Sequence, residues 1–369
     1  MKFKIKRLVL LNALSKTTKA VSAKSPLPSL TGIKFELTHD MLRLTGSDSD
    51  ITIQTCIYVN DNDLDIIETG SVILSARYIL DIVRKLDCEY ITIEFVDGLL
   101  TAIKGSFSKF ELNGTDALEY PRINLNKTGS LFKLDATILK DIVRQTKFAT
   151  SDKETKPLLT GINFKCSNHL LECVATDSYR LAKKVVSIDS DISFNITIPQ
   201  KSLDDISKII DKEKEIDIYV NDRKILFILD NTIIQTRLID GTYLDTSKLI
   251  PVSGPCKLEI DINYLMKSVE RVSLLTNEMN SLIKLDMSED SVILSSKIQE
   301  IGSVDDKLND SFYSGNPISI SFSSKYLSEA IRSFTVEKVR LSFDGDMKPF
   351  IITCLDTNDV IQLILPVRT

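Results

Sequence analysis

Two hydrophobic periodicities alternate along the first third of the chain. Residues 7 to 23 place Leu10, Leu14 and Val21 near one helical face, and the segment after Ser75 repeats that helical spacing. Ser75 itself is a suitable N-cap for this second helix. Around the helices, apolar and polar residues alternate as in half-buried strands, expected at 33–37, 41–45, 51–59, 90–95 and 107–112. The pattern predicts a helix, strands, a second helix and more strands.

The same order then recurs. The Leu-Thr-Gly-Ile motif at 30–33 returns at 159–162, and Asp48-Ser49 returns as Asp177-Ser178, each 129 residues later (30 to 159, and 48 to 177). One offset shared by two motifs indicates an internal duplication. We expect the shared Thr160, Gly161, Ile162 and Asp177 to serve the fold. Tyr179, Arg180 and Leu181 have no likeness in the first copy, so function is expected there.

The repeat sets the domain organisation. Helices are expected again at 135–150 and 200–210, and a third copy with helices at 261–276 and 323–334 follows the proline-rich linker at 251–255. We predict three domains, at residues 1–125, 126–252 and 253–369. Two amphipathic helices must bury their apolar stripes, so each domain is expected to lay them on antiparallel sheet in an α+β fold.

Basic residues stand opposite the apolar stripe of each predicted helix. In the helix from 135, Lys140, Arg144 and Lys147 stand at i, i+4 and i+7. One such stripe is typical of a solvated helix face, but six predict a basic surface on a chain of net charge −5. No aromatic residues interrupt the stripes, so contact with a polyanion would be independent of sequence and sensitive to salt. The other stripes comprise Lys16 and Lys19; Arg77, Arg84 and Lys85; Lys201 and Lys208; Lys267 and Arg271; Lys325 and Arg332.

Composition narrows the function classes. The chain is 43% hydrophobic and 26% charged, as in ordinary soluble proteins, and no apolar run approaches the ~20 residues of a membrane helix. Six scattered cysteines without CxxC spacing indicate reduced thiols and a cytoplasmic location. Phosphate-binding glycine motifs are absent, and His39 and His169 fall in predicted turns. The acidic clusters at 48–50 and 61–65 are interpreted as turn and edge charges, so neither catalysis nor a metal or cofactor is expected.

Six sequence motifs follow one another along the chain: SPLPSLTGIKFE, TGSDSDI, LSARYILDIVRKL, PLLTGINF, ATDSYRLA and LILPVR. With them the chain resembles the bacterial DNA polymerase III β subunit, the replicative sliding clamp, over essentially its whole length. The resemblance implies a non-catalytic head-to-tail homodimer of three-domain subunits, closed as a ring with helices lining the hole and duplex DNA threaded through it. It also implies partners: the polymerase III catalytic subunit, the clamp loader and other proteins with a clamp-binding peptide, but no membrane.

The resemblance further implies three sets of site residues. Lys24, Lys153 and Lys156 join the helix cations as DNA-facing residues, giving Lys16, Lys19, Lys24, Arg84, Lys140, Arg144, Lys147, Lys153, Lys156, Lys201, Lys208, Lys267, Arg271 and Arg332. A partner-peptide pocket is expected from Leu159, Thr176, Ser178, Tyr179, Arg180, Leu181, Leu249, Tyr326, Met347, Pro349, Leu363, Ile364, Leu365, Pro366, Val367 and Arg368. A dimer seam is expected between Phe110 and Leu112 on one side and Leu274 and Leu275 on the other.

Two rival functions stay open at this point. A monomeric DNA-binding protein with direct sequence readout would show a strong base preference on short linear DNA. A nucleotide-processing enzyme, motivated only by the acidic clusters, would show phosphatase or nuclease activity.

Overall fold

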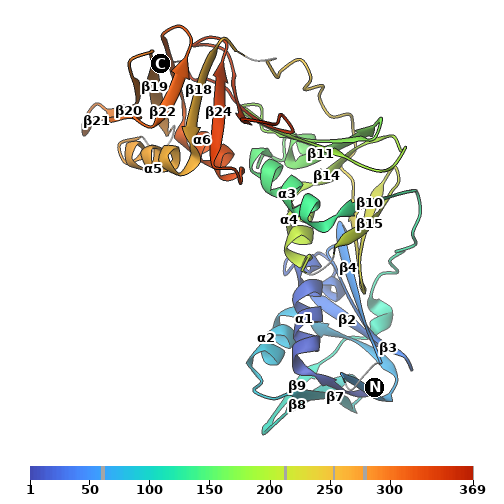
Figure 1. The fold of residues 1–369 in the computed structure, drawn as a ribbon. Helices are drawn as coiled ribbons and strands as arrows, with labels where there is room; N and C mark the ends of the chain where they lie inside the picture. The colour runs from blue at the N-terminus through green and yellow to red at the C-terminus, as the bar shows by residue number, and fades with distance from the viewer. Residues whose placement is uncertain (60–62, 212–213, 252–253, 277–280, 369) are drawn as a thin grey trace. The chain divides into compact units, whose positions relative to one another are not determined.

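The computed structural model describes residues 1–59, 63–211, 214–251, 254–276 and 281–368 (Figure 1). Part of the acidic cluster at 61–65 and the predicted domain boundary at 252/253 lie outside the described residues. By contact density the chain divides into two compact units, Met1–Ala136 with Asp205–Leu238, and Thr137–Asp204 with Ile239–Thr369. Helix α4 (Gln200–Ile209) contributes residues to both units.

The first unit contains two antiparallel sheets. One has the order β5-β1-β7-β8-β9 and the other β10-β15-β16-β17-β4-β3-β2-β6. Its helices are α1 (Arg7–Thr17) and α2 (Ala76–Lys85). Its strands are β1 (Lys2–Lys6), β2 (Gly32–Leu37), β3 (Met41–Ser47), β4 (Ile51–Tyr58), β5 (Leu64–Glu68), β6 (Gly70–Ser75), β7 (Tyr90–Asp97), β8 (Leu100–Gly105), β9 (Ser108–Asn113), β10 (Ser130–Asp135), β15 (Glu215–Val220), β16 (Lys224–Leu229) and β17 (Thr232–Arg237).

The second unit contains a nine-stranded sheet, β14-β11-β12-β13-β26-β25-β24-β18-β22, and a four-stranded sheet, β21-β20-β19-β23. Its helices are α3 (Ala136–Thr146, of which Ala136 counts with the first unit), α5 (Ile262–Ser273) and α6 (Ser324–Arg332). Its strands are β11 (Gly161–Ser167), β12 (Leu170–Thr176), β13 (Arg180–Ser187), β14 (Phe194–Pro199), β18 (Cys256–Asp261), β19 (Leu282–Met287), β20 (Val292–Ile298), β21 (Gly302–Lys307), β22 (Ser311–Ser314), β23 (Ile318–Ser323), β24 (Lys338–Phe343), β25 (Phe350–Cys354) and β26 (Val360–Ile364).

All six predicted helices are present, but α1 ends at Thr17, six residues before its expected end at 23. The helix pair α1 and α2 shares one core with strands from both sheets of the first unit, including Phe3 of β1 and Phe35 of β2 (Figure 1). Each helix pair was expected to pack on a single sheet, whereas α1 and α2 pack against two sheets. The reason is that each of the two three-stranded meanders in a copy supplies its own sheet.

Helix starts follow the expected chemistry in one unit but not in the other. The carboxylate of Asp261 accepts from the backbone N–H of Tyr264 at 2.8 Å at the start of α5, and Ser323 caps α6 in the same way. Ser75 does occupy the N-cap position of α2, but its side chain makes no capping hydrogen bond, so that part of the prediction is wrong.

The repeated motifs form the same local structure in both units. The Oδ1 atom of Asp48 accepts backbone N–H bonds from Asp50 and Ile51 at 3.0 and 2.9 Å. The Oδ1 atom of Asp177 likewise accepts from Tyr179 and Arg180, at 2.8 and 3.0 Å. These bonds fix a tight turn in which the following serine takes a positive φ (84° for Ser49, 82° for Ser178). The shared aspartate therefore serves the fold, as predicted.

Strand pairing continues across both predicted domain boundaries. Within the first unit, β17 pairs antiparallel with β4, with Thr232 opposite Thr55 and Thr236 opposite Ile51. Within the second unit, β26 pairs antiparallel with β13, with Arg180 opposite Ile364 and Lys184 opposite Val360. We call these two strand pairs the sheet junctions. In each, the last strand of one copy joins the third strand of the preceding copy's first meander.

Candidate functional site

The predicted peptide pocket centres on an apolar cluster beside the β13–β26 junction. The cluster consists of Leu159, Val174, Leu181, Tyr243, Ile351 and Leu363, all less than a tenth exposed, with Leu158, Ile250, Ile361 and Leu365 packed against it. Leu181 faces Leu363 directly across the junction, so strand register fixes the cluster's centre. Ile351 and Val174 were not predicted, because nothing in the local sequence separates them from ordinary core residues.

Arg180 is the most tightly held charged residue of the predicted pocket. Its side chain is only 9% exposed, with Nε 3.0 Å from Oδ2 of Asp177 and Nη1 hydrogen-bonded to Oε2 of Glu329. The guanidinium also lies over the rings of Tyr326 and Phe148, at 4.5 and 5.4 Å from their centroids. These contacts fix the guanidinium within the predicted pocket. Glu329 and Phe148 were missed, since they lie far from Arg180 in sequence.

A polar cavity of about 400 Å³ lies beside Arg180. Of the predicted pocket residues, Ser178, Tyr179, Arg180 and Tyr326 line it. Lys153 and Lys156, expected to face DNA, line the same cavity, so the structure brings together residues that the sequence had assigned to two sites. Burial, with the nearby Asp177 carboxylate, raises the pKa of the Tyr326 phenol.

The remaining pocket residues divide by exposure. Leu249, Met347 and Val367 are each about half exposed, as a surface that accepts a peptide requires. Thr176 is buried, and its hydroxyl donates to the carbonyl of Arg180 at 2.6 Å. Ile364 points the other way, into the core formed with α5 and α6, because successive residues of β26 alternate between faces. Its assignment to the pocket is therefore wrong. Pro349, Pro366 and Arg368 are at least partly exposed.

The tail is anchored through its backbone. The N–H of Leu365 donates to the carbonyl of Tyr179 at 3.0 Å, which extends the β13–β26 junction by one bond. The N–H of Val367 donates to the carbonyl of Ser321 at 2.8 Å. These bonds hold the tail against the turn before β13 and against β23.

Several predicted DNA-facing cations are paired with carboxylates of the same chain. Arg144 is the most constrained: it pairs with Asp141 at 2.8 Å and donates to the carbonyl of Ser333 at the end of α6. Lys147 lies 2.5 Å from Asp204. The other pairs of this kind are Arg84 with Asp81, Arg271 with Asp306, and Arg332 with Glu270. The basic surface is thus partly neutralised before any partner binds.

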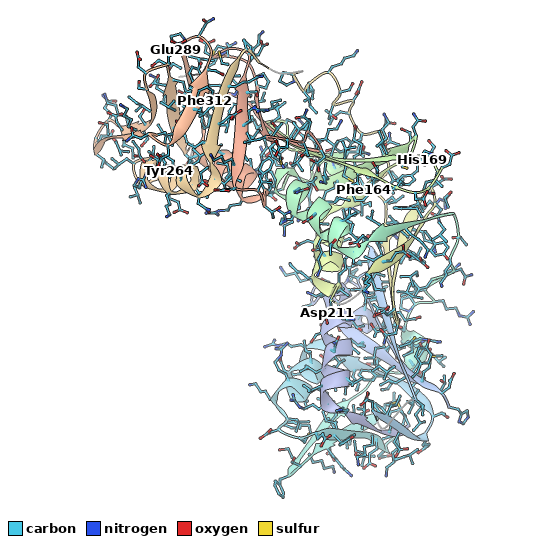
Figure 2. The ribbon with its side chains drawn as sticks, in the orientation of Figure 1. Phe164, His169, Asp211, Tyr264, Glu289 and Phe312 are labelled. Atoms are coloured by element: carbon cyan, nitrogen blue, oxygen red, sulfur yellow. The ribbon has the colours of Figure 1, made fainter. Side chains whose placement is uncertain are left out.

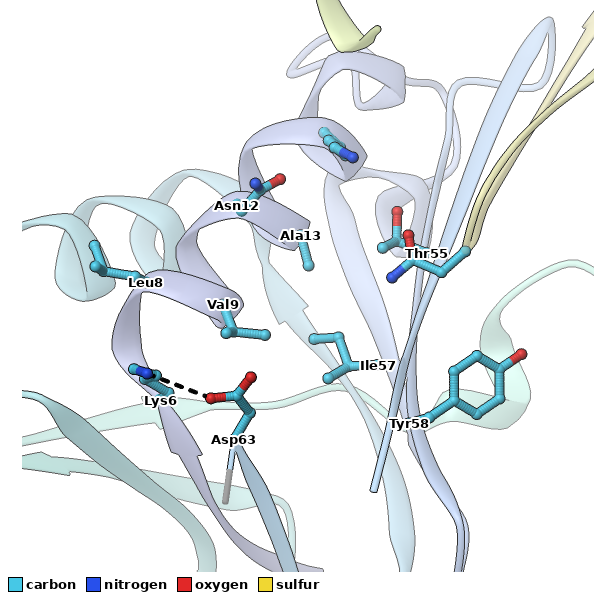
Figure 3. Close-up of a pocket in the computed structure, with 11 residues that line it drawn as sticks. Lys6, Leu8, Val9, Asn12, Ala13, Thr55, Ile57, Tyr58 and Asp63 are labelled. Atoms are coloured by element: carbon cyan, nitrogen blue, oxygen red, sulfur yellow. Dashed lines mark ion pairs between the residues drawn. The ribbon is translucent and has the colours of Figure 1, made fainter. Parts of the chain in front are cut away.

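Other members of that set are exposed or half-exposed. Lys16 lines a cavity of about 500 Å³ between α1 and β4, in which Lys6 pairs with Asp63 at 3.5 Å (Figure 3). Lys19 is half-exposed in the turn after α1. The exposed residues are Lys24, Lys201, Lys208 and Lys267, while Lys140 is half-exposed on α3.

The predicted seam residues occupy sheet and helix ends. Phe110 and Leu112 lie on β9, the edge strand of the five-stranded sheet, and Phe110 is 40% exposed. Leu274 follows the end of α5 and is 81% exposed, with Leu275 beside it half-exposed. Both histidines lie in turns, as expected, and His169 is seen at the β11–β12 turn in Figure 2.

Three family models match the chain in order. They describe the N-terminal, central and C-terminal domains of the DNA polymerase III beta subunit, over residues 1–125, 133–245 and 247–368. The chain belongs to the DNA polymerase III beta subunit family. The beta sliding clamp of Bacillus subtilis (strain 168) is 38% identical over 377 residues, and that of Staphylococcus aureus (strain N315) is 38% identical over 376. Both matches span the whole of each chain.

Solved structures agree with this beta-subunit assignment. The crystal structure of the DNA polymerase sliding clamp from Bacillus subtilis superposes with a TM-score of 0.96 at 37% identity, covering 100% of this chain and 99% of that one. The beta subunit from DNA polymerase of Streptococcus pyogenes superposes at 0.95 with 30% identity over the whole of both chains. The beta subunit is therefore a sliding clamp of replication that acts without catalysis, and the resemblance and α+β fold predicted from sequence are confirmed. Among its described helices, none is long and apolar enough to cross a membrane.

Proposed function

We propose that this sliding clamp works in the cytoplasm as a head-to-tail homodimer, a closed ring around duplex DNA that tethers the polymerase III catalytic subunit and other partners through a bound peptide. The sheet junctions carry the dimer proposal. They join last strands to first-meander strands, β17 to β4 and β26 to β13. The equivalent strands left over are β9, the last of the first copy, and β21, the third strand of the last copy's first meander.

Both leftover strands are sheet edges. Within the described residues, β9 pairs only with β8, and β21 only with β20. An open edge is a template for another chain, so pairing β9 with the β21 of a second copy would repeat the internal junction between subunits. A head-to-tail pair of such contacts closes a ring and leaves neither edge open. The exposed apolar side chains of Phe110 and Leu274 suit the core of that interface.

The mass of the particle tests the dimer directly. Sedimentation at micromolar concentration should give twice the 41.4 kDa chain mass. Phe110→Asp should lower it to one chain, because it places a charge in the interface. Ile67→Asp is the matched control: Ile67 is similarly exposed on β5, at the opposite edge of the same sheet, and its dimer should persist. A wild-type monomer, or a Phe110→Asp variant that remains dimeric, contradicts the proposed seam.

Topological retention supports a role for an acidic chain at DNA, since a closed ring needs no tight contact. The clamp should stay on nicked circular DNA after a loader opens it, and should leave when the circle is linearised. Retention on free-ended DNA, or a strong base preference, would instead indicate the monomeric sequence-reading protein.

The peptide site is proposed at the apolar cluster and the polar cavity next to Arg180. Leucine and isoleucine side chains around Leu181 and Leu363 suit an apolar anchor, while Tyr179, Lys153 and Lys156 offer polar contacts at its border. Half-exposed Leu249, Met347 and Val367 would lose water-exposed apolar area when the peptide binds.

A further inference from the structure

Arg271 on α5 is held by a carboxylate that is itself held in place. Its Nε and Nη2 atoms lie 2.9 and 2.6 Å from Oδ2 of Asp306 on β21. The hydroxyl of Ser268 donates to the same oxygen at 2.8 Å. The Asp306 side chain is only 19% exposed, whereas that of Arg271 is 51% exposed. The carboxylate is thus a fixed anchor, and the guanidinium bound to it still reaches solvent.

A looser pair stands one residue away on the same helix. Nη2 of Arg332 at the end of α6 lies 3.7 Å from Oε1 of Glu270 on α5, and both side chains are more than 60% exposed. Each of the third copy's two predicted DNA-facing arginines therefore has a carboxylate partner, Asp306 on β21 for Arg271 and Glu270 on α5 for Arg332. A simple count of basic residues overstates the charge that this surface offers to DNA.

We propose that Asp306, and more weakly Glu270, are internal counterions that compete with DNA phosphates for Arg271 and Arg332, and so limit how firmly the ring holds the duplex. The inference rests on the proposed function, because it presumes that α5 and α6 face DNA. Asp306 is a positioning residue here: it touches no DNA and acts through Arg271.

The competition follows from the chemistry of the groups. A carboxylate and a phosphate both accept charge-assisted bonds from a guanidinium, and a half-exposed arginine exchanges one for the other at small net cost. Each phosphate neutralised releases counterions and steepens the fall of log K with log salt by about 0.9. A sliding ring must break every such contact at each step, so fewer contacts give faster diffusion along DNA.

Removal of the Asp306 charge tests the proposal. Asp306→Asn keeps the side-chain shape and frees Arg271 in each of two subunits, so the salt slope for binding a short duplex should steepen by about 1.8, twice the single-phosphate value. Rings loaded on circular DNA should diffuse more slowly at low salt in single-molecule tracking. In an Arg271→Gln background the same change should have no effect on the slope.

The chain offers a closely matched control. Nε and Nη2 of Arg340 lie 2.9 and 2.7 Å from one oxygen of Glu259, the same two-bond arrangement, and Nη1 of Arg340 also donates to the carbonyl of Leu355 at 3.2 Å. This pair lies on the sheet face away from α5 and α6, because its strand neighbours Leu258 and Leu341 point into the helix-side core. Glu259→Gln removes the same charge and breaks the same kind of ion pair, yet should leave the salt slope unchanged.

Each outcome decides the matter. An unchanged slope for Asp306→Asn, an equal steepening by Glu259→Gln, or a steepening that survives Arg271→Gln overturns the proposal. Because Asp306 lies on β21, sedimentation must show that the Asp306→Asn variant remains dimeric. If it does not, Glu270→Gln is the deciding variant, and a smaller steepening of the salt slope is expected for it. An unchanged salt slope for Glu270→Gln would then refute the proposal. Failure of wild-type retention on circular DNA would contradict the proposed function itself, which separates the two ideas.

Discussion

Replacing Arg180 with methionine should loosen the β13–β26 junction more than any other single charge removal in the second unit. The methionine keeps an apolar stem between the rings of Phe148 and Tyr326 but removes the guanidinium. Asp177 and Glu329 then lose their ionic contact with it, although Oδ1 of Asp177 keeps its two backbone N–H bonds. The Asp177 side chain is 13% exposed, so water replaces the lost bond poorly.

The expected loss of stability follows from how deeply these side chains are buried. Breaking a buried ion pair by removing one partner costs about 3–5 kcal/mol. Glu329 is 31% exposed and partly rehydrates, which argues for the lower end, while two lost cation–π contacts add to the cost. We expect a loss of about 3 kcal/mol, which corresponds to roughly a hundredfold more frequent opening at 1.4 kcal/mol per tenfold.

Native-state hydrogen exchange of the β26 amides is the appropriate assay, because a multidomain chain does not guarantee two-state unfolding. Arg237→Met is the matched control at the other sheet junction: its pair with Asp50 spans 3.8 Å, both side chains are about 70% exposed, and at most about 1 kcal/mol is expected. A double-mutant cycle with Glu329→Gln should show a coupling energy above about 1 kcal/mol. Unchanged β26 protection, or additive single changes, would refute the reasoning.

Two further predictions concern the tail and the acid limit of stability. Removing Leu365 to Thr369, the last of which lies outside the described residues, should weaken a polymerase-derived peptide at least tenfold while sedimentation still gives a dimer; unchanged peptide affinity would refute the pocket. Hydrogen bonds from Lys104 and then Lys2 lower the pKa of Glu94 to about 2 from the ordinary 4.5, so this carboxylate stabilises the fold above pH 4.5 and loses that effect as pH falls toward 2. Acid unfolding followed by circular dichroism should therefore show a wild-type advantage over Glu94→Gln that vanishes across this window, and parallel curves would argue against it.

Helices and turns could be predicted from the sequence, but the pairing of strands that are distant in the chain could not. Helical spacing located all six helices, and the repeated Asp48 and Asp177 specified one turn twice, because both signals act over a few residues. The sheet junctions join strands far apart in the chain, and no local pattern selects their partners. Ile364 illustrates the cost: without the register of β26 its face could not be assigned, and a one-residue shift reverses it.

The two sheet junctions share a topology but are held together differently, and this difference bears on where partners bind. At β4–β17 a side-chain contact joins the buried hydroxyls of Thr55 and Thr232, 3.1 Å apart at one end of the paired strands. At β13–β26, Arg180 stands where the first copy has Ile51, and it bonds carboxylates from both of the copies that the junction joins. A peptide that binds beside the β13–β26 junction would therefore lie next to the ion pairs of Arg180 with Asp177 and Glu329. These ion pairs already hold that wall of the proposed pocket in place. We therefore expect Arg180 to favour peptide binding chiefly by preorganising that wall, which lowers the conformational cost of binding, and less by touching the peptide.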